Sequence, residues 1–237
     1  MAAPQLPSAL FLSEHMAELN EGARFLESIG AEEYAKLREE GRVVKLARGQ
    51  ILFSQGEVHG GVWVIESGLL RTFYVSAQGR EMTLAYWTSG HFVGGPEIFG
   101  RGRHVWSADA QAPSEVLFLP GAVLRRLAER VPQVALALID GLVAKGKCYS
   151  ALVQMLGTRS AAERLTLLLE IMAETYGRPT EEGILIDRVI TQEQLATMLG
   201  TSRQWLSVSL EKLRSEGVIT MSRHQIILRN PTPSGRR

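Results

Sequence analysis

Cysteine is almost absent from this sequence of 237 residues, in which Cys148 is the only one. A single thiol excludes internal disulfides, a cysteine-rich zinc site and an iron–sulfur cluster held by the cysteines of one chain. We expect Cys148 to be a small buried hydrophobe, with a redox switch on the long helix as the alternative.

Long apolar runs are also lacking. No stretch approaches the roughly 18 apolar residues of a membrane span, and Asp140, for example, interrupts Val134–Ala144. The stretch Met1–His15 lacks the basic start and the apolar core of a secretory signal. Hydrophobic residues make up 45% of the chain and charged residues 22%, which excludes a disordered chain, a collagen-like repeat and a coiled-coil rod. We therefore expect a cytoplasmic globular protein without membrane contact.

The chain lacks an overall charge of one sign, because 26 basic residues offset 25 acidic ones. The charges are unevenly distributed, however: residues 1–60 hold 6 Lys/Arg and 9 Asp/Glu, whereas residues 191–237 hold 7 and 3. A basic C-terminal end indicates an anionic partner such as nucleic acid, with a solvated basic tail as the alternative.

Glycine is concentrated in one part of the chain, since residues 41–121 contain 13 of the 23 glycines. Short runs of alternating, β-branched or aromatic residues lie between them, which is typical of strands closed by glycine-containing turns. The spacing predicts a two-sheet antiparallel roll of about eight strands, with a hairpin tip at Ala77–Gly79. The predicted strands are Gln50–Phe53, Val62–Glu66, Leu69–Val75, Glu81–Tyr86, His91–Val93 and Val116–Leu119.

The pattern becomes helical after Gly121, and Val131-Pro132 predicts a break with a long helix starting just after it. Spacings of three and four along this helix predict a coiled-coil seam, interrupted by Lys145. Such a seam after a small β domain favours a dimer interface over an ordinary core helix. The predicted seam consists of Ala135, Leu138, Leu142, Tyr149, Leu152 and Leu156.

A further helix is expected to begin at Ser160, which forms a capping box with Glu163. The polar segment Arg178–Gly183 is expected to be a turn, and Ile184–Ile190 a short strand. The apolar face of the helix consists of Leu165, Leu168, Leu169 and Met172.

Residues 191–217 give the sharpest signal, reading TQEQLATMLGTSRQWLSVSLEKLRSEG. Thr191 and Gln194 predict another capping box, Gly200 permits a tight turn, and Ser202 can cap a second helix. Two short helices joined through glycine predict a helix-turn-helix. Two strands around Ser222-Arg223 would form its β-hairpin wing.

The second of these helices carries polar residues at its N-terminal end. In the major groove, arginine can bond guanine and glutamine can bond adenine, while hydroxyls and the helix N-terminus favour phosphate. This face favours DNA binding over a helical hairpin that mediates protein contacts. The candidate residues are Thr201, Ser202, Arg203, Gln204 and Ser207.

The layout from Leu37 to Asn230 resembles the CRP/FNR family of bacterial transcription regulators. RGQILFSQGEVHGGVWVIESGLLR resembles the opening of the family's β-roll, and TQEQLATMLGTSRQWLSVSLEKLRSEGVI is similar to its DNA-binding signature. The resemblance implies a homodimer joined along the long helices, which reads double-stranded DNA with two-fold-related half-sites and contacts RNA polymerase. It places Arg203 where the family commonly reads guanine and Gln204 at the next position. It also implies backbone contacts from Thr191, Gln192 and Arg223, for which capping and surface polarity are the alternatives.

The sequence departs from the family in two places. Val208 stands where the cyclic-AMP-responsive members carry a second base-reading arginine, so a different DNA consensus is expected. In the effector pocket, cyclic-nucleotide binders carry a glutamate for the ribose and an arginine for the phosphate. Gly95 and His104 occupy these positions, with Glu97 and Arg103 displaced. The candidate pocket residues are Gly94, Gly95, Glu97, Arg103, His104, Tyr149 and Ser150.

The sequence therefore does not decide the identity of the effector. The departures disfavour a cyclic nucleotide unless the register is off by one residue at Arg103, and haem ligation by His91 or His104 is an alternative. A cupin-like metal enzyme would need closely spaced ligands such as His-x-His, which the five histidines do not provide. We expect neither a metal site nor catalytic residues.

The sequence thus predicts an α+β protein with an N-terminal antiparallel, jelly-roll-like β-roll over residues 1–130 as sensor. A long dimerisation helix with a hinge would span residues 131–159, and a winged helix-turn-helix residues 160–237. The predicted function is an effector-controlled, DNA-binding transcription regulator, in which an unknown small molecule between roll and long helix shifts the hinge near Leu156–Ser160. The alternatives are a ligand-sensing module that contacts proteins, and a β-roll metalloenzyme.

Overall fold

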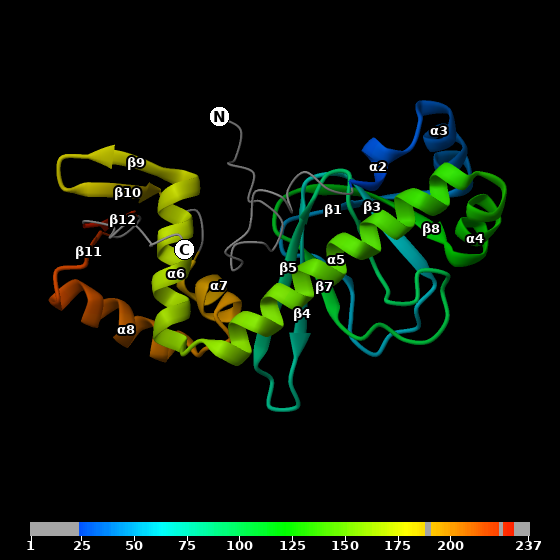
Figure 1. Ribbon diagram of the computed structural model, residues 1–237. Coiled ribbons are helices and arrows are strands. Elements are labelled where there is room, and N and C mark those ends of the chain that lie inside the picture. Colours follow the sequence, from blue (N-terminus) through cyan, green and yellow to red (C-terminus); the bar gives the residue numbers. More distant parts are fainter. Residues whose placement is uncertain (1–23, 188–190, 223–224, 230–237) are drawn as a thin grey trace. The chain divides into compact units, whose positions relative to one another are not determined.

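The structure is a computed structural model that describes residues 24–187, 191–222 and 225–229 (Figure 1). The chain divides into two compact units, Met1–Leu152 and Val153–Arg237. Each unit has its own sheets, helices and core, and each is described by itself.

The first unit contains two four-stranded antiparallel sheets with the strand orders β1-β8-β3-β6 and β2-β7-β4-β5. This arrangement confirms the predicted two-sheet roll, and Gly79 lies in the predicted turn between β4 and β5 with a positive φ of 76°. The strands are β1 Arg42–Leu46, β2 Ile51–Phe53, β3 Gly61–Ser67, β4 Leu69–Val75, β5 Glu81–Thr88, β6 Phe92–Val93, β7 Ser107–Ala110 and β8 Ser114–Pro120.

Two of these strands are absent from the sequence prediction. All four residues of β7, with the sequence SADA, are buried, so the strand shows no alternation and has no β-branched or aromatic residue. In β1, with the sequence RVVKL, charged residues hold two of the five positions. Each of these strands therefore depends on backbone pairing with a neighbouring strand. β1 pairs with β8, and β7 pairs with β4.

The two sheets enclose an apolar core. Leu70 and Ala108 point into it from one sheet, and Ile65 and Val116 from the other, and all four are fully buried. This pairing follows the alternation of inward and outward side chains along each strand.

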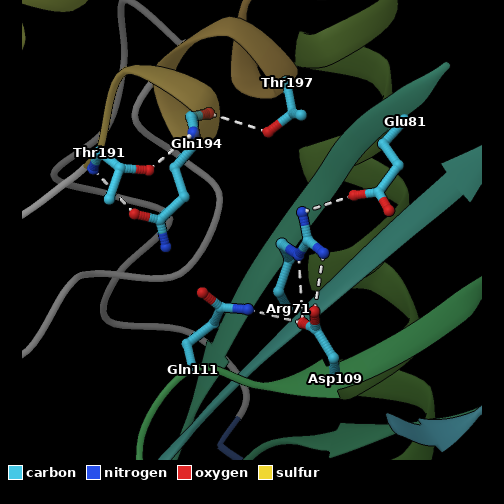
Figure 2. Close-up of polar contacts among 7 residues, drawn as sticks. All are labelled: Arg71, Glu81, Asp109, Gln111, Thr191, Gln194 and Thr197. Atoms are coloured by element: carbon cyan, nitrogen blue, oxygen red, sulfur yellow. Dashed lines mark hydrogen bonds and ion pairs between the residues drawn. The ribbon is translucent and has the colours of Figure 1, made fainter. Parts of the chain in front are cut away.

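A buried ion pair joins three neighbouring strands of the roll (Figure 2). The Arg71 guanidinium on β4 donates two hydrogen bonds to the Asp109 carboxylate on β7, at 3.1 and 2.7 Å, and one to Glu81 on β5 at 3.1 Å. The Gln111 amide also donates to Asp109, at 2.7 Å. Because both charges are paired and hydrogen-bonded, their burial is tolerated.

Four helices belong to the roll: α2 Phe25–Ser28, α3 Ala31–Glu40, α4 Gly121–Arg130 and the long α5 Pro132–Thr158. The break between α4 and α5 at Val131-Pro132 is as predicted, with Pro132 at the first position of α5. Gly141 is needed where α5 meets the roll, because a Cβ there would lie 2.4 Å from the Phe92 ring. The face of α5 that packs on the roll consists of Val134, Ala137, Leu138, Gly141, Lys145, Cys148 and Leu152.

The predicted seam is wrong in part, because Leu138 and Leu152 are buried. A second series with the same spacing lies on the exposed side of α5, and we call it the outer stripe. Two series on one helix can both follow spacings of three and four, so periodicity alone does not decide which of them is exposed. The outer stripe consists of Leu136, Ile139, Val143, Gly146, Ser150 and Val153.

The second unit contains the end of α5 and then α6 Ala161–Tyr176, whose predicted capping box between Ser160 and Glu163 is present. Its predicted apolar face is buried. A four-stranded sheet with the order β11-β12-β10-β9 accompanies the helices. The remaining elements are β9 Gly177–Thr180, β10 Gly183–Asp187, α7 Gln192–Met198, α8 Arg203–Ser215, β11 Ile219–Met221 and β12 Gln225–Leu228.

The wing is confirmed as the antiparallel pair β11 and β12. The expectation of a turn over Arg178–Gly183 is wrong in part, because β9 pairs with β10 up to Thr180. Backbone pairing outweighs the polar composition of this segment, and only the two glutamates between the strands form the turn. The last three residues of the predicted strand Ile184–Ile190 lie outside the described residues.

Candidate functional site

The two helices of the second unit are positioned by their caps. The Thr191 hydroxyl accepts a hydrogen bond from the Gln194 amide at 3.2 Å, and the Gln194 side chain accepts one from the Thr191 amide at 2.9 Å (Figure 2). This is the predicted capping box of α7. The Ser202 hydroxyl caps α8 by accepting from the Trp205 amide at 3.1 Å. Between the helices, Gly200 has the positive φ of 63° that the turn requires.

Apolar packing fixes which side of α8 faces outward. Leu206 and Leu210 on α8 are fully buried, as are Leu195 on α7 and Leu199 at its end, and the small Ala196 on α7 is also buried. Because positions 206 and 210 lie one turn apart, they define the inner side of the helix. Gln204 and Ser207 point away from that side and are exposed, and Arg203 is exposed as the first residue of the helix, as the sequence predicts.

The polar groups on this exposed side are available to a partner. Neither Arg203 nor Gln204 makes a side-chain hydrogen bond or ion pair within the described part of the chain. The carboxylates further along α8 have partners, Arg214 for Glu211 and Lys212 for Glu216. A guanidinium and an amide with free donors can bond base edges.

The other predicted DNA-contacting residues lie around the same helices. Thr201 is half-buried, with its hydroxyl 3.4 Å from the Ala196 carbonyl. Thr191 is exposed at the start of α7, next to the half-buried Gln192. Arg223 lies outside the described residues.

Three of the candidate effector residues, Gly94, Gly95 and His104, lie around His59, a histidine that the sequence prediction does not include. His59, 2% exposed, accepts a hydrogen bond at Nε2 from the Gly95 amide at 2.5 Å. A nitrogen that accepts carries a lone pair, so the proton of the neutral ring is on Nδ1. Burial lowers the pKa of His59, and its Nδ1 has no partner among the described residues.

His104 stands beside His59, with ring centroids 4.3 Å apart. It is 5% exposed and stacks on Phe53 at 3.8 Å. Burial, and secondly His59, lower the pKa of His104 to about 4, so its ring is neutral at pH 7. A sequence signal that could have identified this pair is the presence of one histidine in each of two glycine-rich loops. The two loops are joined by a backbone hydrogen bond from the His59 amide to the Gly102 carbonyl at 3.0 Å.

The remaining pocket candidates are less enclosed. Glu97 and Arg103 are exposed, and Arg103 donates a hydrogen bond to the Gly56 carbonyl at 2.7 Å. Tyr149 is half-buried, with its ring 5.5 Å from that of Trp106. Ser150 is exposed and belongs to the outer stripe. The structure therefore brings Gly94, Gly95 and His104 together but places Ser150 on the other side of α5.

A buried lysine on α5 packs against the roll at Phe92 and Trp87. Lys145 is 7% exposed, and its ammonium donates to the Phe92 carbonyl at 2.6 Å. It lies 3.6 Å from the centroid of the Trp87 ring and 4.6 Å from that of Phe92. Among the described residues, no carboxylate pairs with it. Burial lowers the pKa of Lys145 to about 7.

Two ionisable neighbours share this environment. Cys148 is buried, and burial raises the pKa of its thiol to about 12, which leaves little of the reactive thiolate. His91 bonds through Nδ1 with the Thr88 carbonyl at 3.2 Å. Burial, and secondly Lys145, lower the pKa of His91 to about 4.

Within the described residues, no group of three or more His, Cys, Asp or Glu side chains is arranged to hold a metal ion. In the same part of the chain, no helix is both long and apolar enough to cross a membrane.

Models of two protein families match the chain. A cyclic nucleotide-binding domain matches residues 43–131, and a Crp-like helix-turn-helix domain matches residues 163–232. Together they cover the roll, α4 and most of the second unit.

Curated and solved proteins resemble the chain along most of its length. It is 24% identical over 174 residues to the regulatory protein HlyX of Actinobacillus pleuropneumoniae, covering 73% of this chain and 72% of that protein. It is 22% identical over 192 residues to the global nitrogen regulator of Synechococcus elongatus, covering 80% and 86%. The solved structure of CLP, the c-di-GMP responsive global regulator of Xanthomonas campestris, matches with a TM-score of 0.75 at 17% identity, covering 85% of this chain and 100% of that one. This last likeness shows the fold.

Proposed function

This chain belongs to the CRP/FNR family of transcription regulators, and from that premise we propose how its two units act. The protein is a DNA-binding transcription regulator with an effector-binding β-roll and a helix-turn-helix. The observation that best supports DNA reading by this particular chain is the exposed side of α8, where Arg203 and Gln204 have free donors.

We infer the following roles at the DNA. Arg203 bonds the O6 and N7 atoms of a guanine, and Gln204 bonds an adenine. Ser202, Thr201 and Ser207 contact phosphates near the N-terminus of α8, where the helix dipole favours negative charge. Thr191, Gln192 and Arg223 contact the DNA backbone; Thr191 can do so as a donor, since its oxygen already accepts from the Gln194 amide.

A selection of bound genomic fragments tests this function. We expect the wild-type protein to enrich fragments that share an inverted repeat. Affinity for the enriched site should fall at least tenfold between roughly 50 and 200 mM salt, because binding releases counterions from the phosphates. Binding measured by fluorescence anisotropy over this salt range checks the slope. A protein that enriches no sequence, or whose affinity is independent of salt, would not be a DNA-reading regulator.

We propose that two copies associate through the outer stripe of α5. Leu136, Ile139 and Val143 are at least half exposed, and their spacing is that of a two-helix seam. Gly146 continues the series, and nothing lies within 4 Å of where its Cβ would be, which leaves room for a partner helix to approach closely. A two-fold dimer would present its α8 helices to successive major grooves about 34 Å apart, which fits an inverted repeat.

The outer stripe can be tested with Val143→Ala. Val143 is 50% exposed, so folding of each copy should be nearly unaffected. Since Val143 is only half exposed in each copy, removing two carbons from both copies should weaken dimerisation by about 1.5 kcal/mol, half of the value for fully exposed carbons at about 0.8 kcal/mol each. Sedimentation equilibrium measures this constant. Val58→Ala, which alters a 74% exposed valine in the roll, is the matched control. Equal dimerisation constants for the two variants would contradict this interface.

We further infer that the effector binds at the roll, next to α5, and that it is not a cyclic nucleotide. The neutral His104 occupies the position expected for the phosphate-binding arginine, and Arg103 is exposed with a bond to Gly56. The Gly95 amide, a natural donor to a ligand oxygen, already donates to His59. These residues do not fit a cyclic phosphate, which needs a charge-assisted bidentate partner.

Regulation then proceeds in the cytoplasm, where such a protein meets the chromosome and RNA polymerase. Effector binding shifts the hinge between the end of α5 and Ser160, and the DNA-bound dimer contacts the polymerase. The relatives are regulators, which supports a protein without catalytic activity over the β-roll enzyme, and over a module that contacts only proteins.

A further inference from the structure

One residue on the DNA-facing side of α8 has no polar group. Val208 is 66% exposed and apolar, whereas all other exposed residues of α8 are polar or charged. It lies one turn after Gln204 and next to Ser207, so it belongs to the same side of the helix as the predicted base contacts.

The fold itself does not account for a valine at this position. The inner side of α8 is formed by Leu206 and Leu210, which are fully buried, while Val208 faces away from them. A β-branched residue also lowers the stability of an exposed helix relative to alanine or lysine, because its side chain loses rotamer freedom. Neither packing nor helix propensity favours valine over these residues.

The chemistry of the major groove offers a partner for it. The C5-methyl group of thymine is the apolar feature of the base edges, whereas the other bases present hydrogen-bond donors and acceptors. A valine cannot pair with the donors and acceptors of the other bases. Against thymine it gains binding free energy, because the C5-methyl group is buried in the contact. Side chains one helical turn apart lie about 5–6 Å from each other, and base pairs are stacked at about 3.4 Å, so Gln204 and Val208 can reach neighbouring base pairs.

We propose that Val208 selects thymine in each half-site, through contact with its C5-methyl group, beside the base pair that Gln204 reads. This inference rests on the proposed DNA-binding function and adds one position to its specificity. It explains why an apolar residue is exposed on a surface that otherwise carries free donors.

Deleting the methyl group from the DNA tests the contact directly. In the operator obtained by selection, each thymine is replaced in turn by uracil, which changes only the C5 substituent. We expect one thymine per half-site at which uracil weakens binding by about fourfold, or about 15-fold when both half-sites are changed, as for one and two buried methyl groups. Fluorescence anisotropy on synthetic duplexes gives these ratios.

The matched variant is Val208→Ala, whose shorter side chain cannot reach the methyl group. It should bind the thymine and uracil operators equally, while Val58→Ala should keep the full preference for thymine. Val208→Arg should exchange the preferred base pair at that position from T·A to G·C, since arginine bonds guanine. Because Val208 is exposed, both substitutions should keep a cooperative thermal unfolding transition, with at most a small rise in its midpoint from the better helix formers.

The outcomes separate this inference from the function on which it rests. If the wild-type protein selects an operator but no thymine in it responds to uracil, or if Val208→Ala retains the response, Val208 does not read a methyl group. If no operator is selected at all, it is the DNA-binding function that fails.

Discussion

Replacing Lys145 by methionine should stabilise the protein at pH 7 and remove most of the rise in its stability with pH. A lysine has a pKa of about 10.4 in an unfolded chain, whereas burial lowers the pKa of Lys145 to about 7 in the folded state. Between these values the unfolded chain binds a proton that the folded protein does not, so the free energy of unfolding increases with pH across this window. The full increase is at most about 5 kcal/mol, at about 1.4 kcal/mol per pH unit.

The groups packed around Lys145 define the pH range for this measurement. The pKa of His91 is lowered to about 4 in the folded protein, so its contribution to the free energy of unfolding depends on pH only below about pH 6.5. The pKa of Cys148 is raised to about 12, and above about pH 8.5 the unfolded thiol ionises while the folded one does not, which lowers stability. Urea unfolding between about pH 7 and 8.5 therefore reports mainly on Lys145, with an expected rise of about 2 kcal/mol.

The variants should differ clearly in this range. Lys145→Met fills the same volume without a charge to bury, so its stability should change little with pH. Lys147→Met replaces an exposed lysine on the same helix and should keep the wild-type slope. A wild-type protein with no slope between these pH values, or a Lys145→Met variant with the same slope, would show that the buried amine remains charged.

The second large effect is expected at the DNA. Arg203→Ala should weaken binding to the selected operator by about 10²- to 10⁴-fold, because a bidentate arginine–guanine contact contributes about 1–3 kcal/mol in each of two half-sites. Binding to unrelated DNA should change far less, so the ratio of the two affinities should collapse. Competition binding against a duplex of shuffled sequence measures that ratio.

A matched control lies on the same helix. Arg214 is exposed in the last turn of α8 and is paired with Glu211, so Arg214→Ala removes the same charge without removing a free guanidinium near the N-terminus. It should keep most of the preference for the operator. Arg203→Lys should recover little, because an ammonium cannot form two parallel bonds to one base. If Arg203→Ala and Arg214→Ala lose equal amounts of preference, Arg203 acts only as a charge.

Much of this architecture could be predicted from local chemistry. The capping boxes at Ser160 and Thr191, the turn at Gly200 and the proline at the start of α5 are set by residues close in sequence, and the structure has them all. The polar side of α8 was equally readable, because Leu206 and Leu210 mark its opposite side.

What could not be predicted depends on contacts between distant segments. The side of α5 that faces the roll is decided by the fit of Gly141 against Phe92, which periodicity does not reveal. The bond from the Gly95 amide to His59 joins two loops 36 residues apart. In the sequence, Lys145 interrupts the predicted seam. Its spacing of seven residues from both Leu138 and Leu152 nevertheless places it on the same side of α5 as these two leucines, which are buried.

The position of Lys145 also has a consequence for how α5 can move. Its ammonium is held on the side toward the roll, while Val143 and Gly146 lie on the outward side of the same turns. Successive residues of an α-helix are about 100° apart around the axis, so a rotation of α5 by even one residue position would carry the amine away from the Phe92 carbonyl and turn Val143 away from a partner helix. Lys145 thus adds a polar tie to the apolar packing that holds α5 against the roll, and in the proposed dimer it would help to fix the direction in which the outer stripe faces.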